Sequence, residues 1–296
     1  VALREGKIVG VLPHMACRGL KGGRNLISMP YAVYGGALGS EAGIERALVD
    51  VAARRAEAEG CGRLELRCRE DPGLDLPASD LYATFVRELP QSAEEVLGTL
   101  PKKARAQARK ARQRHGLVLE RDDSAVDLLV RLFHENKRRL GSPALPAALF
   151  HELLGEFGER VVVHFVRREG QPLTAVMSFL MGDTLYAYYS GSAPNVDRQY
   201  SASNFMYMAL QEWSVERGLR QFDFGRSRRD AGAFAFKQHQ GFEPKALHYR
   251  FHLVRDRELP SLNPSNPKTK WMRETWSRLP LWMTRRLSTP AARYLP

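Results

Sequence analysis

A short pattern that occurs twice limits the fold of this chain more than any other feature of its sequence. Each copy begins with a turn and an apolar strand, and continues with a glycine that follows a helical segment. The next strand carries an acidic residue between apolar ones, Glu65 in the first half and Asp223 in the second. Three pairs of segments match in the same order: residues 5–11 and 169–176, 59–66 and 217–224, and 81–85 and 247–251. This order predicts a duplicated domain.

The second half shows the order of elements most clearly. We expect strands at residues 161–167, 172–180, 184–189, 221–224 and 246–253, and helices at residues 204–216 and 233–239. An antiparallel meander, one long helix, a central strand and a further helix and strand indicate an α+β domain with a mixed sheet flanked by helices. This order is the one expected of the GNAT (acyl-CoA N-acyltransferase-like) fold, so the predicted fold class is two such domains in tandem. A different α+β fold with inserted helices is the alternative.

The repeat divides the chain into four predicted parts. They are a first GNAT-like domain at residues 1–97, a basic connecting helix at 98–116, a second GNAT-like domain with the active site at 117–258, and a basic tryptophan-containing tail at 259–296. Because the chain begins at Val1 rather than at a methionine, a truncated N-terminus of the first domain is an expectation.

The charge balance narrows the choice of partner. Lys and Arg (45) outnumber Asp and Glu (33), giving a formal net charge of +12, which favours RNA, an anionic lipid or a phosphate-bearing substrate. No apolar run approaches the roughly 18–20 residues of a membrane span. The three cysteines lack the spacing of a zinc site or a disulfide framework. We therefore expect a cytoplasmic protein without a metal site, with the inner face of the membrane as the alternative location.

Residues 102–114, in the predicted connecting helix, carry seven positive charges and no negative one. Ala104, Ala108 and Ala111 form a narrow stripe at helical spacing, so one side can pack closely while the other presents charge. Two interpretations are open: a solvated linker, or a surface for the phosphates of a partner such as tRNA. Since no aromatic residue is interleaved, base stacking is not indicated.

The tail contains two amphipathic segments separated by Pro280. Its apolar positions are Trp271, Met272, Thr275, Trp276 and Leu279, then Leu281, Trp282, Met283 and Leu287, with Lys270, Arg273, Arg278, Arg285 and Arg286 beside them. Tryptophan and arginine on opposed faces are typical of a helix that lies on lipid headgroups. The pattern predicts peripheral membrane contact through residues 268–287. The alternative is that the tryptophans dock the tail onto the protein itself.

Several motifs carry a resemblance to a known family. They are Tyr34-Gly35-Gly36, Leu100-Pro101-Lys102, the stretches 186–192 and 198–204, and above all Phe222-Asp223-Phe224-Gly225-Arg226-Ser227 with Phe236-Lys237-x-x-x-Gly241-Phe242. Over nearly the whole chain the sequence resembles the FemAB family of peptidoglycan-bridge aminoacyltransferases and their relatives, in particular the branch associated with exosortase/PEP-CTERM exopolysaccharide loci. The resemblance implies tandem GNAT domains that transfer an activated aminoacyl or acyl group to an amine, without a metal.

The predicted catalytic residues are Lys237, Asp223 and Tyr188. Lys237 occupies the lysine of the family motif among aromatic residues, where an ammonium can stabilise an oxyanion or bind a phosphate. The plainer interpretation is a surface lysine on a short helix. Asp223 can take a proton from the attacking amine, or it pairs with an arginine. Because Tyr188 and Tyr189 alternate across a strand, we expect only one of them to face the cleft.

The residues predicted to bind substrate are Tyr189, Ser190, Arg198, Ser203, Asn204, Arg226, Phe236 and His239. Arg198-x-x-Ser201-x-Ser203 lies where acyl-CoA-dependent GNAT enzymes carry Gln/Arg-x-x-Gly-x-Gly/Ala, a loop that offers backbone N–H groups to a pyrophosphate. The serines weaken this CoA interpretation, and Ser203 or Asn204 also suits an ordinary helix N-cap. His239 also suits a plain position on a helix surface.

These observations predict an acyl- or aminoacyltransferase that modifies an amine on a cell-envelope or exopolysaccharide-related precursor. No bound cofactor is expected, and the donor is either an aminoacyl-tRNA or an acyl thioester of CoA or a carrier protein. Two alternatives remain: an acyl-CoA- or carrier-protein-dependent N-acyltransferase of ordinary GNAT type, and a non-catalytic module that binds anionic lipid or RNA.

Overall fold

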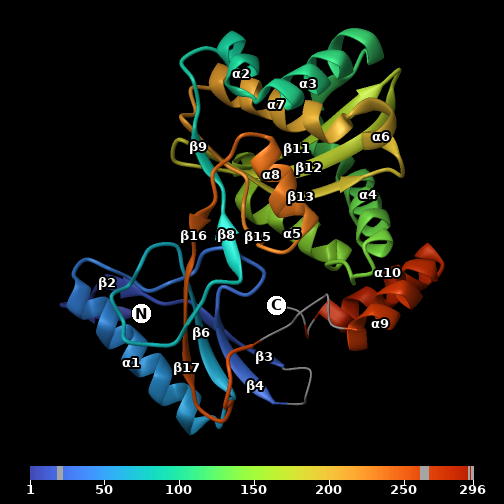
Figure 1. Ribbon diagram of the computed structural model, residues 1–296. Coiled ribbons are helices and arrows are strands. Elements are labelled where there is room, and N and C mark those ends of the chain that lie inside the picture. Colours follow the sequence, from blue (N-terminus) through green and yellow to red (C-terminus); the bar gives the residue numbers. More distant parts are fainter. Residues whose placement is uncertain (19–22, 261–266, 293, 295–296) are drawn as a thin grey trace. The chain divides into compact units, whose positions relative to one another are not determined.

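The computed structural model describes residues 1–18, 23–260, 267–292 and 294 (Figure 1). The chain forms two compact units: unit 1 comprises Val1–Ala83, Lys245–Asn263 and Arg293–Pro296, and unit 2 comprises Thr84–Pro244 and Pro264–Ala292. Within the described residues, no helix combines the length and the apolar character that crossing a membrane would require.

Unit 1 is built from a five-stranded sheet with helix α1 (Ala42–Ala58) against one face. The strands in order are β3 (His14–Arg18), β4 (Arg24–Ser28), β6 (Arg63–Cys68), β17 (His248–Leu253) and β7 (Ala78–Ser79). A smaller sheet contains β1 (Ala2–Arg4), β2 (Lys7–Val11) and β5 (Leu38–Gly39), and two further short strands are β8 (Tyr82–Thr84) and β16 (Lys245–Ala246). The core forms where Ala52 and Ala56 of α1 pack near Leu26 and Leu64 of the sheet.

Unit 2 is a six-stranded sheet with helices on both faces (Figure 1). The strands in order are β10 (Val118–Arg121), β11 (Val161–Arg168), β12 (Gln171–Met181), β13 (Thr184–Ser192), β14 (Gln221–Asp223) and β9 (Val86–Glu88). Neighbouring strands are antiparallel except β13 and β14, which are parallel.

The helices of unit 2 form two separate apolar layers. The first layer contains α2 (Ala93–Thr99), α3 (Lys102–His115), α7 (Ala202–Glu216) and α8 (Gly232–His239), and the second contains α4 (Val126–Arg139) and α5 (Ala147–Phe157). The remaining elements are the turns η1 (Asp123–Ala125) and η2 (Gly158–Arg160), helix α6 (Val196–Tyr200) and strand β15 (Ser227–Arg228). Because both faces are covered, every side chain of β11 from Val161 to Val166 is buried. The predicted α+β class with mixed, helix-flanked sheets is confirmed.

The end of the second half differs from the prediction. The strand expected at residues 246–253 pairs as β17 with β6, with Phe251 opposite Glu65, and so completes the sheet of unit 1. Residues 117–258 are therefore not a self-contained unit. The alternation of Tyr249 and Phe251 indicates which face of the strand is buried. It does not indicate the partner strand, because any open sheet edge offers the same backbone hydrogen bonds.

Helix α3 is confirmed as a helix, but it is part of unit 2 rather than a separate connection. Its predicted stripe of Ala104, Ala108 and Ala111 is buried in the apolar layer that also contains α7. Arg112 forms an ion pair with Glu212 of α7. Most of the basic side chains on the other side are exposed.

The tail contains helices α9 (Pro267–Arg278) and α10 (Leu281–Ala292), which belong to unit 2. Residues 261–266, 293, 295 and 296 of the predicted tail lie outside the described residues. A hydrogen bond from Arg138 Nη1 of α4 to the carbonyl oxygen of Leu279 (3.0 Å) ties the turn between the two helices to the domain.

His164 on β11 is a polar residue inside the apolar layers of unit 2. It is fully buried, its ring lies 4.5 Å from that of Trp213, and neither ring nitrogen has a hydrogen-bond partner in the described part of the chain. Burial lowers its pKa to about 4, because a charged imidazolium here would lose its hydration.

This burial predicts an acid-sensitive fold. His164 is neutral in the folded protein but binds a proton below its ordinary pKa of 6.5 when unfolded. The contribution of His164 to the free energy of unfolding is therefore fully present above about pH 6.5. It falls by on the order of 3 kcal/mol as the pH drops towards 4. Urea unfolding of His164→Leu between pH 7 and 4 should show a weaker loss than the wild type. The exposed His239→Leu is the control, and equal pH dependence of His164→Leu and wild type would contradict the prediction.

Candidate active site

Strands β13 and β14 separate partway along the sheet of unit 2. They pair in parallel only from Thr184 to Tyr186 on β13 and from Gln221 to Asp223 on β14. β13 continues to Ser192, whereas β14 ends at Asp223. The later part of β13 is therefore not paired by β14.

A β-bulge lies in this part of β13. Met177 of β12 pairs with Tyr189 and Ser178 pairs with Ala187, so Tyr188 falls between two paired positions. A bulged residue leaves the ladder and redirects its neighbours, and bulges are enriched beside active sites for this reason. The bulge thus gives the sheet a local irregularity where β14 has already ended.

The bulge also overturns the expected alternation of the two tyrosines. The ring centroids of Tyr188 and Tyr189 lie only 5.0 Å apart, so both rings are on the same side of the sheet. The expectation that only one of them faces the cleft assumed a regular strand, which the extra residue interrupts. Tyr189 also packs on Phe133 and Phe150, and burial raises its pKa.

The two residues after Tyr189 hold β13 to the helices on its two faces. Ser190 accepts a hydrogen bond from the hydroxyl of Tyr207 on α7 (3.1 Å), and burial raises the pKa of Tyr207 to about 12. Gly191 faces α4, where a Cβ atom would come within 2.4 Å of the backbone nitrogen of Phe133. Only glycine allows α4 to approach β13 so closely.

Lys237 of α8 is the central polar residue beyond the end of β14. Only 7% of its surface is exposed, and its Nζ donates to the carbonyl oxygens of Gly225 (2.8 Å) and Arg226 (3.1 Å). Nζ also lies 5.3 and 5.1 Å from the ring centroids of Phe85 and Phe224. Burial lowers its pKa to about 7, against an opposing effect of the Asp223 carboxylate. The alternative of a surface lysine does not fit this burial.

Asp223 holds the same turn from the other side. It is buried, and its Oδ1 accepts a hydrogen bond from the backbone N–H of Gly225 at 2.7 Å. Gly225 has a φ of +69°, a conformation that glycine adopts without strain. Asp223 therefore shapes the turn and stabilises the charged form of Lys237.

Lys137 of α4 is a functional candidate that the sequence did not single out. Its Nζ lies 5.3 Å from the ring centroid of Phe133, which packs on Tyr189. Burial lowers its pKa, and the nearby charge of Arg226 lowers it further. Because Lys137 precedes two arginines near the end of a helix, its sequence looks like an ordinary basic C-terminal turn. Its burial is visible only in the structure.

The N-terminus of α7, where a CoA pyrophosphate would bind, is capped by the protein itself. The backbone N–H of Ser203 donates to Asp197 Oδ1 (2.6 Å), and its hydroxyl donates to Asp197 Oδ2 (3.0 Å). Ser201, at the position of the first motif glycine, has a φ of +55°. A carboxylate at this position already interacts with the helix dipole. Arg198 lies on the exposed side of α6.

The other predicted site residues have clear positions. Asn204 Oδ1 accepts a hydrogen bond from Gln240 Nε2, which ties α7 to the end of α8. Phe236 packs on Tyr207 and Phe224, and is part of the wall around Lys237. His239 is exposed. The structure thus groups Lys237, Asp223, Arg226 and Phe236 around one turn and Tyr188, Tyr189 and Ser190 on the neighbouring strand, while Arg198 and Ser203 mark the α7 N-terminus.

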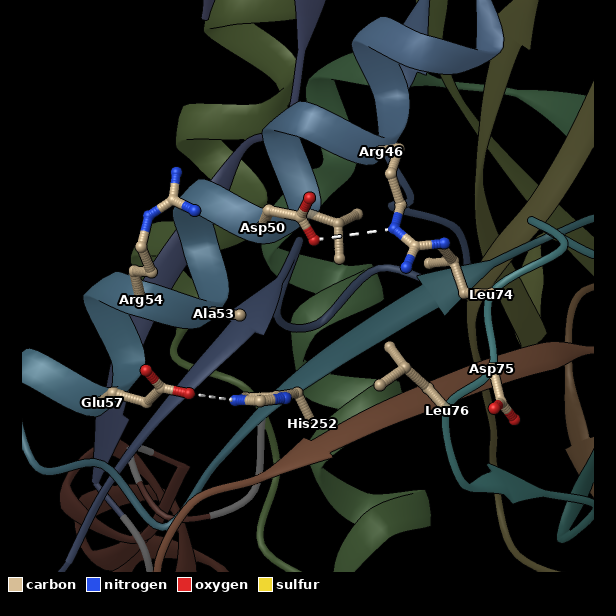
Figure 2. A pocket seen from close by; sticks show the side chains of 10 residues that line it. Arg46, Asp50, Ala53, Arg54, Glu57, Leu74, Asp75, Leu76 and His252 are labelled. Carbon is tan, nitrogen blue, oxygen red and sulfur yellow. Dashed lines mark hydrogen bonds and ion pairs between the residues drawn. The ribbon is translucent and has the colours of Figure 1, made fainter.

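Figure 2 shows a hollow in unit 1 that contains none of these residues. It has a volume of about 240 Å³ and is lined by α1, residues 74–76 and His252. Two pairs of its polar side chains contact each other: Arg46 lies 3.7 Å from Asp50, and His252 lies 2.9 Å from Glu57. In the described residues there is also no group of three or more side chains suited to hold a metal ion. The second unit therefore provides the better candidate site.

A family model described as an acetyltransferase (GNAT) domain matches residues 100–238. Over these residues the chain is similar to a GNAT domain. The matched segment is slightly less than half of the 296 residues and contains the bulge, the capped α7 and Lys237. No curated protein matches the chain.

Solved structures show the same arrangement over most of the chain. The structure of FemX matches with a TM-score of 0.59 and 14% identity, covering 82% of this chain and 89% of FemX. That of L-PGS from Bacillus licheniformis matches with a TM-score of 0.54 and 12% identity, covering 90% of each chain. A tandem GNAT protein from the clavulanic acid biosynthesis pathway matches with a TM-score of 0.51 and 14% identity, covering 88% of this chain and 82% of the other.

At these identities the structural matches show the fold alone. Together with the GNAT domain, they show a tandem GNAT-like α+β fold, as predicted. The GNAT domain supports an acyl or aminoacyl transferase.

The cap of α7 makes a prediction about stability. Asp197→Ala should lower the free energy of unfolding by about 1 kcal/mol, because it removes both hydrogen bonds to Ser203. Asp197→Asn should retain most of the stability, since its amide oxygen still accepts the backbone bond. Urea unfolding measures both, with Arg198→Ala as an exposed control on the same helix. An Asp197→Ala variant as stable as wild type would show that the cap contributes nothing.

Proposed function

We propose that the protein transfers an acyl or aminoacyl group to an amine at the open part of β13 in unit 2. The observation that carries this proposal is the buried ammonium of Lys237, held beside the end of β14 by the carbonyl oxygens of Gly225 and Arg226. An ammonium has three N–H groups, and the described residues provide hydrogen-bond acceptors for two of them, so we assign the third to a substrate.

The reaction needs charge stabilisation more than a covalent enzyme intermediate. The amine nitrogen attacks the donor carbonyl, the C–O or C–S bond to the carrier breaks, and the amine proton passes to the departing oxygen or sulfur of the carrier. Negative charge develops on the carbonyl oxygen meanwhile, and a positioned N–H donor stabilises it. We assign this role to Lys237 and the orientation of the amine to Tyr188, which the bulge displaces from the ladder.

Asp223 takes a positioning role in this proposal rather than that of the predicted base. Only 1% of its surface is exposed and one oxygen already accepts the N–H of Gly225. Its charge favours the ammonium form of Lys237. Arg226 and Lys137 are proposed to bind an anionic group of the acceptor, because both charges act on the same tyrosine-lined region.

Between the two donor classes, we favour an aminoacyl-tRNA. A CoA pyrophosphate would have to displace the Asp197 carboxylate from the α7 N-terminus and overcome its negative charge. The exposed basic side of α3 offers a surface for the tRNA backbone. An acyl thioester remains the alternative because it suits a GNAT domain.

The acceptor is proposed to be an amine on a cell-envelope or exopolysaccharide-related precursor, reached from the cytoplasm at the inner face of the membrane. The resemblance to the FemAB branch of exosortase-associated loci and the fold shared with FemX support this choice. The amine is neutral when it attacks, whereas the proposed phosphate of the precursor pairs with Lys137 and Arg226.

Replacing Lys237 tests the proposed chemistry. Lys237→Met keeps an unbranched side chain one atom shorter but removes the charge, so transfer should fall at least about a hundredfold if Lys237 stabilises the oxyanion. The measurement is transfer of a labelled group from charged tRNA, or from an acyl thioester, to an amine. Circular dichroism must show an intact fold, and the exposed Lys245→Met is the matched control.

The pH dependence distinguishes the ammonium from a merely structural lysine. With a pKa of about 7, the active ammonium is lost as the pH rises, so kcat should decline above pH 7. Lys237→Arg keeps its charge at every such pH and should lose this decline if it retains activity. Wild-type turnover in Lys237→Met would refute the assignment.

The donor is tested at α3. Replacing Lys102, Lys103, Arg105 and Arg109 by Gln should weaken binding of tRNA in gel shifts and reduce the slope of log affinity against log salt by up to about 3. Neutralising the exposed Arg46 and Arg54 of α1 is the control and should leave the slope unchanged. Undiminished tRNA binding by the α3 variant would favour the thioester donor.

A further inference from the structure

Helices α9 and α10 attach to unit 2 through small polar residues, not through their tryptophans. Thr284 and Ser288 of α10 are 2% and 1% exposed, and the Ser288 hydroxyl accepts a hydrogen bond from the backbone N–H of Ala144 at 3.1 Å. On α9, the backbone at Arg273 lies so close to Gly141 that a Cβ atom there would come within 2.6 Å of it. The docking of these helices is therefore accounted for without most of their apolar side chains.

Four large apolar side chains of the two helices face solvent. Trp271 and Trp282 are 63% and 65% exposed, and Met272 and Leu287 are 55% and 44% exposed. Trp276, Leu279, Leu281 and Met283 are partly buried, and the indole nitrogen of Trp276 is buried. Of the two interpretations of the tail sequence, self-docking through the tryptophans thus applies to Trp276 alone. Two exposed tryptophans on adjoining helices are unusual for a surface that meets only water.

The charges around these side chains favour an anionic partner. Five exposed basic residues lie on the two helices, against the single acidic Glu274: Lys270, Arg273, Arg278, Arg285 and Arg286. Tryptophan rings locate at the headgroup level of a bilayer, and basic side chains beside them attract anionic lipids. A protein partner would need complementary acidic groups and a defined shape, which two short convex helices do not specify.

A hollow on α4 beside these helices has room for a headgroup. It has a volume of about 440 Å³ and is lined by Glu135, Arg138, Arg139, Pro194, Ser277 and Leu281. The Nε of Arg138 is buried and has no acceptor among the described residues. A phosphate oxygen is the acceptor that a guanidinium N–H binds best.

We infer that the exposed face of α9 and α10 binds a bilayer containing anionic lipid, with Trp271 and Trp282 inserted at the headgroup level. The basic side chains lie against lipid phosphates, and the hollow beside Arg138 receives one headgroup. The contact is reversible, because two short helices with a handful of basic residues bind a surface without spanning it. This inference goes beyond the transfer reaction and does not depend on Lys237.

Vesicle co-sedimentation of the full chain tests the inference. Wild type should bind vesicles of phosphatidylcholine with about 30% phosphatidylglycerol, bind phosphatidylcholine alone weakly, and show a blue shift of tryptophan emission on binding. Trp271→Ala/Trp282→Ala should bind at least about tenfold more weakly, and Arg285→Gln/Arg286→Gln should lose a similar factor at low salt. Ile8→Ala/Met15→Ala removes two exposed apolar side chains of unit 1 and should bind as wild type does.

Three results would overturn the inference. The first is equal binding to both vesicle types, and the second is undiminished binding of the tryptophan variant. The third is a wild type that forms a dimer and does not bind vesicles, together with a tryptophan variant that is monomeric. Size-exclusion chromatography with light scattering reports the last. Lys237→Met should bind vesicles like wild type, and Trp271→Ala/Trp282→Ala should act on a soluble amine like wild type. Failure of the membrane contact and failure of the proposed reaction therefore give different results.

Discussion

The buried ammonium of Lys237 is the interaction on which the geometry of the candidate site depends. Burial disfavours the charged form of Lys237 and lowers its pKa to about 7, although the charge of Asp223 opposes this effect. Two carbonyl oxygens and the faces of Phe85 and Phe224 also lie against the ammonium. These contacts hold the turn after β14, where Gly225 has a positive φ and the carbonyl oxygens of Gly225 and Arg226 accept hydrogen bonds from Lys237.

The neighbouring strand is fixed by packing rather than by charge. Gly191 lets the backbone of α4 lie directly on β13, and the bulge at Tyr188 turns two consecutive tyrosines to the α4 side. As a result, Phe133 and Lys137 of α4 come next to Tyr189, and the charge of Arg226 acts on both Lys137 and Tyr189. Two cations, Lys137 of α4 and Arg226 of the turn after β14, thus lie beside the aromatic wall of Phe133 and Tyr189.

The sequence predicted the elements of this site better than their relations. Periodicity located α3 with its buried alanines and α7, and the motif around Lys237 gave the lysine, because local patterns and short motifs are contiguous in the chain. The sequence could not show that β17 pairs with β6, because all open sheet edges offer equivalent backbone hydrogen bonds. A one-residue bulge has no sequence signal here, so the expected alternation of Tyr188 and Tyr189 was wrong. The close approach of α4 to β13 at Phe133 requires Gly191, which lies fifty-eight residues away in the chain.

The capped N-terminus of α7 connects the fold to the choice of donor. A GNAT domain that uses CoA needs free backbone N–H groups at this helix, because the pyrophosphate carries its charge to that point. In this chain serines replace the motif glycines, and Asp197 places a carboxylate on the N–H of Ser203. The N-terminus of α7 would attract either the Asp197 carboxylate or a pyrophosphate. Because the carboxylate is part of the chain, its effective concentration at the helix is high, and it competes with any pyrophosphate from solution. The proposed donor attached to RNA would need no such pocket, because the exposed basic side of α3 offers its phosphates another surface.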